Sequence, residues 1–404
     1  MRFQAIFIVC MFLANPVLAE ESGALKINGF GTLGVVHSDN DKADFVTTIV
    51  ESRGAGYTHS WSAAVDSRLG VQLSYLPTEK LSAVLQVIAE QRDDGVIRPD
   101  VEWAYLQYDI TPDLSVRLGR TVLPIFLHSQ YRKVSYANHW VRPPPEFYVV
   151  PVNTSDGISV LFNHRFGEVN YTLNGVWGQG DQDQAGDIRS EAKNTRVIAN
   201  TFEYGHATLR FAYANTDLTA KKVNELFDAF RVFGAQGAAI ADKYNFDDKM
   251  VRNITVGGSY DPGSWFVMSE WLKSKSDSFL GENEAWYVSG GYRLGKFTPY
   301  LTYSQTRSIN DSNEPKLNTA SVPPFLTGLA IGLNGVLDAL TRPVDQKTIS
   351  LGTRWDFAEN AAFKVQYDHI NLGDNSSGTL ANVQPDFKLG GTVNLLSLVV
   401  DFTF

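Results

Sequence analysis

The feature that most constrains this chain is an alternation of apolar and polar residues that recurs in segments of about ten residues. In "RLGVQLSYL", the residues Leu69, Val71, Leu73 and Tyr75 form one set, and polar residues fill the other. "TISLGTRWDF" and "FKVQYDH" repeat the pattern near the end of the chain. Successive side chains of a β-strand point to opposite faces, so a period of two indicates a strand with one greasy face and one polar face. The sequence therefore predicts an all-β protein.

Sixteen segments are predicted as strands on this basis. They run over 25–36, 67–77, 81–90, 100–110, 114–120, 156–164, 167–178, 194–203, 206–215, 250–261, 264–274, 284–294, 296–306, 346–357, 360–370 and 392–404. Glycines weaken the alternation in the first segment, and in the eighth segment apolar and polar residues occur on both faces. No stretch after residue 19 reaches about 18 consecutive apolar residues, so the sequence predicts no transmembrane helix.

The connections between these strands alternate in length. Tight turns are predicted at 78–80, 111–113, around 167, and at 204–205, 261–263, 295–296 and 358–360. The intervening connections are mostly longer, at 37–66, 91–99, 121–155, 179–193, 216–249, 275–283, 307–345 and 371–391. A meander with short turns at one end and long loops at the other is typical of outer-membrane barrels.

The chain ends on "VNLLSLVVDFTF", in which the alternate apolar residues Leu396, Leu398, Val400, Phe402 and Phe404 reach the last position. In lipid, a sheet edge cannot stay unpaired, because every backbone polar group must be bonded within the protein. The last strand is therefore expected to pair with the first. The sequence predicts a 16-stranded antiparallel transmembrane β-barrel with short periplasmic turns, long extracellular loops and an aqueous lumen.

The N-terminus predicts export. Arg2 precedes the apolar run "AIFIVCMFLA", which is too short to span a membrane, and small residues end the segment at Ala19. Residues 1–19 are predicted as a signal peptide and 20–404 as the barrel, which places the mature chain in the outer membrane in contact with its lipid. The single Cys, Cys10, lies in the segment to be removed, so no disulfide is expected.

Charge and motifs exclude several function classes. The net charge of −9 argues against nucleic acid as a partner, because nothing offsets the phosphate charge. The seven histidines are scattered without the spacing of metal ligands, and no nucleophile or phosphate-binding motif occurs. The chain is therefore expected to have no cofactor and no enzymatic activity. A barrel enzyme and a surface adhesin or receptor barrel are the alternatives from other classes.

These features resemble the Gram-negative porin family over residues 20–404. The likeness is carried by the signal peptide, the opening "LKINGFGTLG", the hairpin "VEWAYLQYDITPDLSVRLGR" and the strand ending at Phe404. The resemblance implies a homotrimer, a third long loop folded into the pore, and recognition of the terminal strand by the barrel-assembly machinery. The inserts at 216–249 and 307–345 depart from general porins and leave pore width and selectivity open.

The third long loop, 121–155, is the candidate constriction. It is rich in aromatic residues, including Phe126, Trp140 and Phe147, and "PPP" at 143–145 stiffens it. Exposed to solvent, it would form a large apolar patch, whereas inside the barrel it can pack against the wall. A cap over the mouth and a trimer contact are the alternatives for this loop.

The predicted pore-lining set combines inward strand positions with this loop. Its members are Arg68, Glu102, Arg117, Arg120, Tyr131, Arg132, Lys133, Tyr136, Arg142, Arg210, Arg354, Lys364 and Asp368, and Glu90, Arg196 and Glu270 are also expected to face inward. Opposed charges across a constriction select the permeant ion. The three cations of the loop, Arg132, Lys133 and Arg142, favour anions. Alternatively, the charges only solvate the lumen and pair with one another.

The sequence thus predicts an outer-membrane porin that lets small hydrophilic solutes or ions diffuse passively. A substrate-specific channel, with a binding track in the loop, is the alternative within transport. The inserts are expected to be partly helical: Val223, Leu226, Phe227 and Phe230 have helical spacing, and "PPFLTGLAIGLNGVLDAL" is a second apolar stretch. These helices are expected to fold over the barrel mouth, with a binding lid as the alternative.

Overall fold

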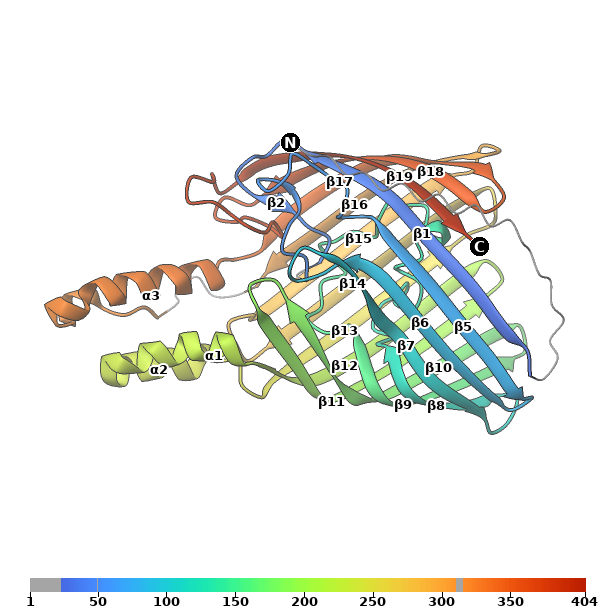
Figure 1. The fold of residues 1–404 in the computed structure, drawn as a ribbon, viewed down its shortest axis with the longest axis horizontal. Helices are drawn as coiled ribbons and strands as arrows, with labels where there is room; N and C mark the ends of the chain where they lie inside the picture. The colour runs from blue at the N-terminus through green and yellow to red at the C-terminus, as the bar shows by residue number, and fades with distance from the viewer. Residues whose placement is uncertain (1–22, 49, 310–314) are drawn as a thin grey trace.

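A computed structural model of the chain describes residues 23–48, 50–309 and 315–404. Sixteen long strands form a closed antiparallel barrel, as predicted (Figure 1). The predicted signal peptide, 1–19, lies outside the described residues.

The barrel strands are β1 (Leu25–Ser38), β5 (Arg68–Thr78), β6 (Leu81–Gln91), β7 (Ile97–Asp109), β8 (Leu114–Val122), β9 (Thr154–Phe166), β10 (Val169–Gln184), β11 (Ile188–Tyr204), β12 (Ala207–Ala220), β13 (Lys249–Tyr260), β14 (Trp265–Ser276), β15 (Glu282–Tyr292), β16 (Phe297–Ser308), β17 (Asp345–Ala358), β18 (Ala361–Leu372) and β19 (Gly391–Thr403). The first long loop adds the short strands β2 (Asp44–Phe45), β3 (Ala55–Gly56) and β4 (Trp61–Ser62). Helices lie in three other loops: η1 (Ser135–Ala137), α1 (Lys221–Asp228), η2 (Ala229–Phe233), α2 (Gly234–Tyr244), η3 (Thr319–Ser321), η4 (Pro324–Leu326) and α3 (Thr327–Leu340).

The two ends of the chain close the barrel. β1 pairs with β19 in a continuous ladder that includes Phe30 opposite Thr403, and Gly29 and Phe404 exchange backbone hydrogen bonds of 2.7 and 2.9 Å. A Cβ on Gly29 would lie 2.1 Å from the Phe404 ring, so glycine is needed for this close approach. The predicted pairing of the last strand with the first is confirmed.

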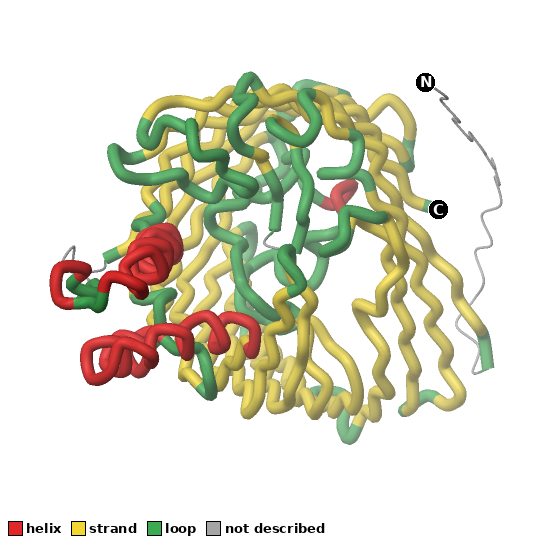
Figure 2. The backbone as a smooth tube through the Cα atoms, turned by 60° about the vertical axis from the view of Figure 1, so that its left-hand side comes forward, coloured by secondary structure: helices red, strands yellow, loops and turns green. Residues whose placement is uncertain are grey.

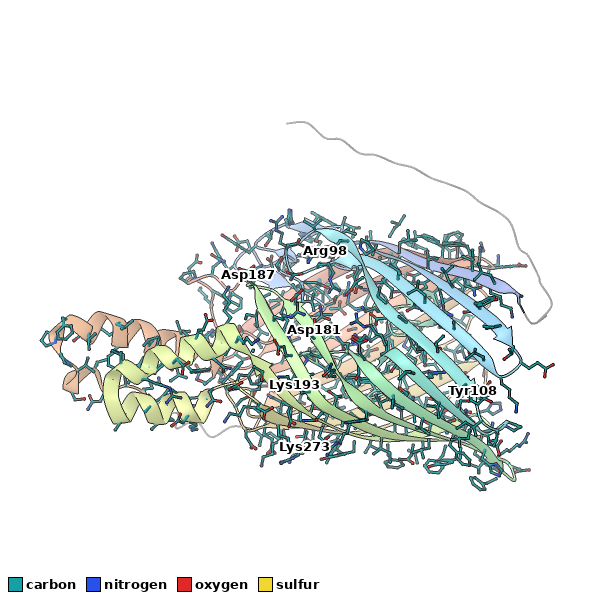
Figure 3. The ribbon with its side chains drawn as sticks, turned by 60° about the horizontal axis from the view of Figure 1, so that its bottom comes forward. Arg98, Tyr108, Asp181, Asp187, Lys193 and Lys273 are labelled. Carbon is teal, nitrogen blue, oxygen red and sulfur yellow. The ribbon has the colours of Figure 1, made fainter. Side chains whose placement is uncertain are left out.

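The outer face of the barrel is apolar, as the alternation predicted. Large side chains such as Trp177, Leu351 and Tyr367 are exposed on it. Figure 3 shows Tyr108 on this face near the short turns, whereas Asp181 and Lys193 lie closer to the helices.

The interior is only partly open. A cluster of buried residues fills the side of the lumen next to β10–β16, where Phe126, Trp140 and Phe147 of the third long loop pack on Tyr287 and Phe266 of the wall. The packed loop therefore narrows the space inside the barrel on this side. The loop supplies its own apolar side chains, which strand alternation alone could not reveal.

The predicted loop 179–193 is mostly strand. β10 and β11 continue to Gln184 and from Ile188, with a register shift between Gly178 and Gly180, and only a three-residue turn joins them. The sequence of this extension, "GQGDQDQ", is polar at every second position and in between. Outside the apolar band a strand needs no apolar face, so the alternation that predicts strands is missing here.

Both predicted helical inserts are confirmed as helical, but they do not fold over the mouth. α1, α2 and α3 project away from the loop end of the barrel (Figure 1 and Figure 2). The two inserts share one buried core with the barrel rim, in which Phe227 and Phe230 are fully buried and Leu333 and Leu337 come from α3. The two inserts pack against each other, and this contact holds the helices away from the opening. No local sequence pattern encodes such a contact. Among the described residues, no helix combines the length and apolar composition needed to cross a bilayer.

Candidate functional site

The segment between β8 and β9, residues 123–153, enters the barrel and is hereafter called the inner loop (Figure 2). Its side chains bond to wall strands that are far away in sequence. The Trp140 indole donates to Ser289 on β15 and Thr302 on β16, both at 3.0 Å. The Tyr136 hydroxyl donates at 2.6 Å to the carbonyl of Glu359, in the turn between β17 and β18. The predicted constriction segment thus lies in the lumen, where it crosses from wall to wall.

Buried charges fix the inner loop to β18 and β19. The fully buried Lys364 ammonium pairs with Asp401 at 2.7 Å and donates to the carbonyls of Ser135 and Trp140, also at 2.7 Å. Polar groups this far from solvent are tolerated because each has a partner. The loop backbone therefore supplies two of the three partners of this ammonium.

A second buried cation, on the inner loop itself, also fixes the loop to the wall. Arg142 pairs with Asp66, and its guanidinium also lies 3.3 Å from Asp368 and donates to Ser397 at 2.6 Å. Arg142, Lys364 and Asp368 were predicted to face the pore. This prediction is wrong for Lys364 and Asp368, which the inner loop covers, whereas Arg142 belongs to the loop and borders the cavity described below, with its charge compensated by ion pairs.

An acid of the inner loop is buried against β17. Glu146 accepts hydrogen bonds from Gln346 at 2.9 Å and from Thr348, and burial raises the pKa of its carboxyl. One of its oxygens has no protein partner among the described residues. A protonated carboxyl suits this environment, since it removes the cost of an unpaired buried charge.

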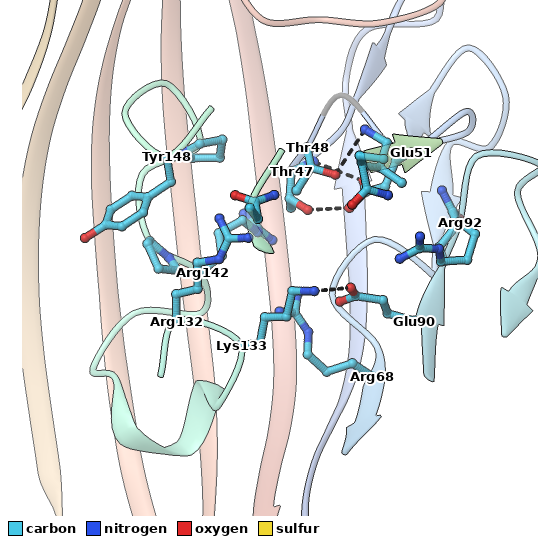
Figure 4. Close-up of a pocket in the computed structure, with 16 residues that line it drawn as sticks. Thr47, Thr48, Glu51, Arg68, Glu90, Arg92, Arg132, Lys133, Arg142 and Tyr148 are labelled. Carbon is cyan, nitrogen blue, oxygen red and sulfur yellow. Dashed lines mark hydrogen bonds and ion pairs between the residues drawn. The ribbon is translucent and has the colours of Figure 1, made fainter. Parts of the chain in front are cut away.

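On the opposite side of the lumen, a cavity of about 70 Å³ lies between the inner loop and the wall formed by β5 and β6 (Figure 4). We call it the outer cavity, because residues of the long loops form its rim, among them Thr47, Thr48, Val50 and Glu51. Arg68 and Glu90 come from the wall, and Arg132 and Lys133 from the loop. The Lys133 ammonium binds Glu90 and Glu102, both at 2.7 Å.

Two guanidinium groups of the outer cavity have no carboxylate partner. Within the described residues, neither Arg68 nor Arg132 makes an ion pair or a side-chain hydrogen bond, whereas Arg92 pairs with Asp100 at 2.9 Å. An arginine keeps its charge at any physiological pH. The three cations Arg68, Arg132 and Lys133 therefore share the two carboxylates of Glu90 and Glu102, which leaves one net positive charge in the outer cavity.

The acid at the rim of the outer cavity does not offset its positive charge at neutral pH. Glu51 is buried in the first long loop, where it accepts a hydrogen bond from the Thr47 backbone at 3.0 Å and another from the Thr47 hydroxyl. Burial raises the pKa of Glu51 to about 8, although Arg68 acts in the opposite direction. Glu51 is therefore mostly protonated at neutral pH.

Beneath the inner loop, toward the short turns, lies a larger space of about 550 Å³, which we call the inner chamber. His128 and Tyr131 of the loop line it together with Arg210 and Arg354 of the wall. Tyr131 faces the inner chamber, whereas the next two residues, Arg132 and Lys133, face the outer cavity. This short stretch of the loop separates the two spaces.

Comparison with known proteins identifies the architecture. No protein-family model matches the chain. An uncharacterised protein of Aquifex aeolicus (strain VF5) is 22% identical over 240 residues, which cover 54% of this chain and 56% of that protein. The chain thus spans about half the length of the curated relative that it matches.

Among solved structures, Salmonella typhi OmpF in complex with daunomycin has a TM-score of 0.57 at 12% identity, covering 96% of this chain and 99% of that one. The channel DcaP of Acinetobacter baumannii has a TM-score of 0.55 at 14% identity, with the same coverage. The anion-selective porin from Comamonas acidovorans has a TM-score of 0.53 at 14% identity, covering 95% of this chain and 100% of that one. This chain has the fold of the Gram-negative outer-membrane porins.

Within the porin fold, the predicted site residues separate into groups. Arg68, Arg132 and Lys133 meet at the outer cavity with Glu102 beneath them, and Tyr131, Arg210 and Arg354 meet at the inner chamber. Arg117 lies on the inner wall, where it donates to Gln107 at 2.8 Å and stacks over Tyr105.

Arg120 and Arg196 were predicted to face inward, and both predictions are wrong. Arg120 lies opposite Asp156, with which it forms a two-bonded ion pair, and two residues before it Leu118 is exposed on the outer face. Arg196 lies opposite the outward Trp177. Because strand side chains alternate, residues 117 and 120 cannot share a face.

Sequence reasoning missed several residues that shape the site. Glu51 and Thr47 lie in a long loop with no periodicity, so no pattern marked them. Asp401 was detectable, because it is an acid on the inward face of the terminal strand, where a buried charge needs a partner. Among the described residues, no group of three or more His, Cys, Asp or Glu side chains is arranged to hold a metal ion.

Proposed function

We propose that this protein is an outer-membrane channel through which small hydrophilic anions diffuse passively. The observation that carries this proposal is the pair of guanidinium groups, Arg68 and Arg132, that face each other across the outer cavity without carboxylate partners. The channel needs no cofactor, since diffusion down a gradient requires only a wet path and a field that admits the solute.

The outer face supports the membrane location. It carries exposed aromatic residues near the short turns, such as Tyr204, Phe297 and Trp355, and Trp177 lies nearer the loops. Two aromatic belts flanking an apolar band are the pattern of barrels that span the outer membrane. The short turns then face the periplasm, and the long loops with α1–α3 face outward. Removal of residues 1–19 during export belongs to the same proposal.

Selectivity follows from the charges left after local pairing. Arg92 is paired with Asp100, whereas Arg68, Arg132 and Lys133 share the carboxylates of Glu90 and Glu102, so one positive charge is in excess. In a narrow space next to a dry, packed loop, such charges are screened less than at an open surface. A permeating anion that enters the outer cavity therefore meets attraction, and a cation meets repulsion. One of the solved structures with this fold is named as an anion-selective porin, which agrees with this direction.

Two partners complete the proposal. The porin fold supports assembly as a homotrimer, and one of the solved structures with this fold is described as a trimer form. The terminal strand ends in the exposed Phe404, which suits recognition by the barrel-assembly machinery. The alternative of a substrate-specific channel keeps support from the same residues, because two unpaired arginines can bind a solute as well as attract it.

The proposal is tested with purified protein in a planar bilayer under a salt gradient. The zero-current potential should take the sign of anion preference, and current should rise linearly with voltage. A cation-selective sign would overturn the anion assignment, and absence of conductance would overturn the channel itself. Current that saturates at low solute concentration would favour the substrate-specific alternative.

A further inference from the structure

Two cations lie directly opposite each other on the outer face of the barrel, toward its loop end. Arg252 on β13 is paired in register with Lys275 on β14, and both side chains are exposed. Like charges at directly opposite positions of neighbouring strands destabilise a sheet. An anion bound between Arg252 and Lys275 would remove this repulsion.

Two more cations extend this pair along the same face. Arg196 on β11 is exposed, and only Asn215 on β12 stands between it and Arg252 in the same row of paired residues. Neighbouring strands lie about 4.8 Å apart, so the Cα atoms of the two arginines are about 10 Å apart. Lys273, labelled in Figure 3, shares the outward face with Lys275 two residues later. We call Arg196, Arg252, Lys273 and Lys275 the cationic patch.

One acid contacts the lysines of the cationic patch. The Glu282 carboxylate on β15 lies 2.7 Å from the Lys273 ammonium and 3.8 Å from that of Lys275. Glu284, which lies opposite Lys273, instead forms an ion pair of 2.6 Å with Arg307. The two lysines therefore share a single carboxylate.

The two arginines of the cationic patch have no acid partner. Among the described residues, Arg196 makes no ion pair or side-chain hydrogen bond, and the Arg252 side chain donates only to the Met250 sulfur, at 3.1 Å. A thioether sulfur is a weak acceptor. Asp217, opposite Met250, and Asp277, just after β14, form no ion pair with either arginine within the same ranges. Both guanidinium groups thus keep exposed donors and an unpaired charge.

Arginines elsewhere on the outer face do have partners in the chain. Arg120 on β8 forms a two-bonded ion pair with Asp156, and Arg307 on β16 donates twice to Glu284, at 2.6 and 3.0 Å. An anion from outside the chain would complete the same pattern at Arg252.

Apolar side chains border the cationic patch on the side of the short turns. Ile198 follows Arg196 by two residues on β11, Ile254 follows Arg252 by two residues on β13, and both isoleucines are exposed. Trp177, directly opposite Arg196, is also exposed. Tryptophans gather where a bilayer meets water. A molecule with an anionic head and acyl chains would therefore meet cations and then apolar residues, in the order of its own groups.

We propose that the cationic patch binds the phosphate group of a membrane lipid in the leaflet on the long-loop side. Arg252 and Lys275 flank the phosphate, Arg196 adds a further charge beside it, and the acyl chains run along Ile198 and Ile254. A guanidinium offers parallel donors that match a phosphate. The inference rests on the proposed function only in that the barrel spans a bilayer, and it adds a lipid preference that diffusion through a pore does not require.

Native mass spectrometry of the detergent-solubilised barrel tests this proposal without requiring conduction. The probes are dioctanoyl phosphatidic acid, dioctanoylglycerol and inorganic phosphate, and the bound fraction is followed against probe concentration. Phosphatidic acid should bind at least about tenfold more tightly than dioctanoylglycerol, which lacks the phosphate. Inorganic phosphate should also bind at least about tenfold more weakly, because it has no chains to cover the isoleucines.

Variants assign the roles of the charges. Arg252→Gln and Lys275→Gln should each weaken phosphatidic acid binding by about fivefold, and the double variant should weaken it further. Arg252→Lys keeps the charge and should lose less than Arg252→Gln. The urea midpoint of lipid-free Arg252→Gln should not fall, because the substitution relieves repulsion from Lys275. The matched control is Arg120→Gln with Asp156→Asn, which removes a paired cation and its acid from the outer face and should leave binding within about twofold.

Equal binding of phosphatidic acid and dioctanoylglycerol, or unchanged binding in the double variant of Arg252 and Lys275, would overturn the lipid site. Inorganic phosphate that binds as tightly as phosphatidic acid would overturn it too, in favour of a site for free anions. None of these results touches the channel proposal, which depends on conductance in bilayers of neutral lipid. Conversely, a barrel that binds phosphatidic acid but does not conduct would overturn the channel and keep the lipid site.

Discussion

Lys364 and Asp401 form an ion pair of 2.7 Å that is completely removed from solvent, between neighbouring strands next to the seam of the barrel. The Lys364 ammonium also binds two carbonyls of the inner loop. One side chain thus links the barrel wall, the terminal strand and the element that divides the lumen. The position of the inner loop is therefore coupled to the closure of the barrel.

Replacing Lys364 with Met should release the inner loop from the wall. The change leaves Asp401 and the carbonyls of Ser135 and Trp140 without their shared donor, and removing one partner of a buried pair costs about 3–5 kcal/mol. We expect a lower urea midpoint of unfolding and noisy, larger single-channel currents. Lys347→Met, at an exposed lysine on β17, is the control and should change neither.

A double variant separates the buried charge from the anchoring of the loop. Lys364→Met with Asp401→Leu leaves no unpaired charge, so the urea midpoint should recover much of its value. The current noise should persist, because the two loop carbonyls still lack a donor. If the noise disappears together with the stability defect, Lys364 does not anchor the loop.

Neutralising the two unpaired arginines of the outer cavity should reduce anion preference. We expect the zero-current potential in a salt gradient to move toward zero in Arg68→Gln and in Arg132→Gln, and further in the double variant, because each substitution lowers the net charge of the outer cavity by one. Arg196→Gln is the control. Its guanidinium is exposed on a strand position opposite the outward Trp177, so its loss should leave the potential unchanged. An equal shift in the control would mean that surface charge, not the outer cavity, sets selectivity.

Selectivity should also depend on pH through Glu51. Burial raises the pKa of this carboxyl to about 8, so it is neutral at about pH 6 and ionised at about pH 9.5. Ionisation places a negative charge near Arg68 at the rim of the outer cavity, and anion preference should fall over this interval. Arg68, Arg92 and Arg132 stay charged throughout, so they contribute no slope.

The same shift has a consequence for stability. An acid whose pKa is raised on folding stabilises the fold fully below its unfolded pKa, and this contribution is lost as the pH rises through about 8. Glu51→Gln should therefore flatten both the selectivity profile and the decline of stability up to about pH 8, measured by urea unfolding at each pH. A wild-type profile that is flat between about pH 6 and about pH 9.5 would contradict the assignment.

The strands were predictable because lipid-facing and lumen-facing residues impose a period of two, and all sixteen were found from that period. The same logic limited the prediction. β10 and β11 extend beyond the apolar band. In this extension both Asp181 and Gln182 are polar, so the alternation of apolar and polar residues that predicts a strand is absent. Arg120 faces outward because the exposed Leu118, two residues before it on β8, lies on the same face.

The site was less predictable than the fold. The aromatic composition of residues 121–155 indicated that the segment should be buried, and the structure places it within the lumen. Which charges remain free was not predictable, because it depends on long-range pairs such as Arg142 with Asp66. The strand pattern predicts which charged residues point into the barrel. Which of these charges face water depends on where the inner loop packs, and the local sequence does not encode that.

The last prediction concerns the pairing of β1 with β19, which closes the barrel. A Cβ on Gly31 would lie 2.4 Å from the Phe402 ring on the neighbouring strand, so Gly31→Val should force this ring off the seam. Overpacking of this kind costs about 1–3 kcal/mol, which should lower the urea midpoint and the temperature at which the barrel unfolds in detergent. Gly175→Val on β10 is the matched control, because nothing lies within 4 Å of a Cβ at that position. Adding Phe402→Ala to Gly31→Val should recover part of the loss by making room for the valine. If Gly31→Val and Gly175→Val unfold at the same urea concentration, the glycine is not needed for closure, and the backbone ladder between β1 and β19 alone holds the two ends of the chain together.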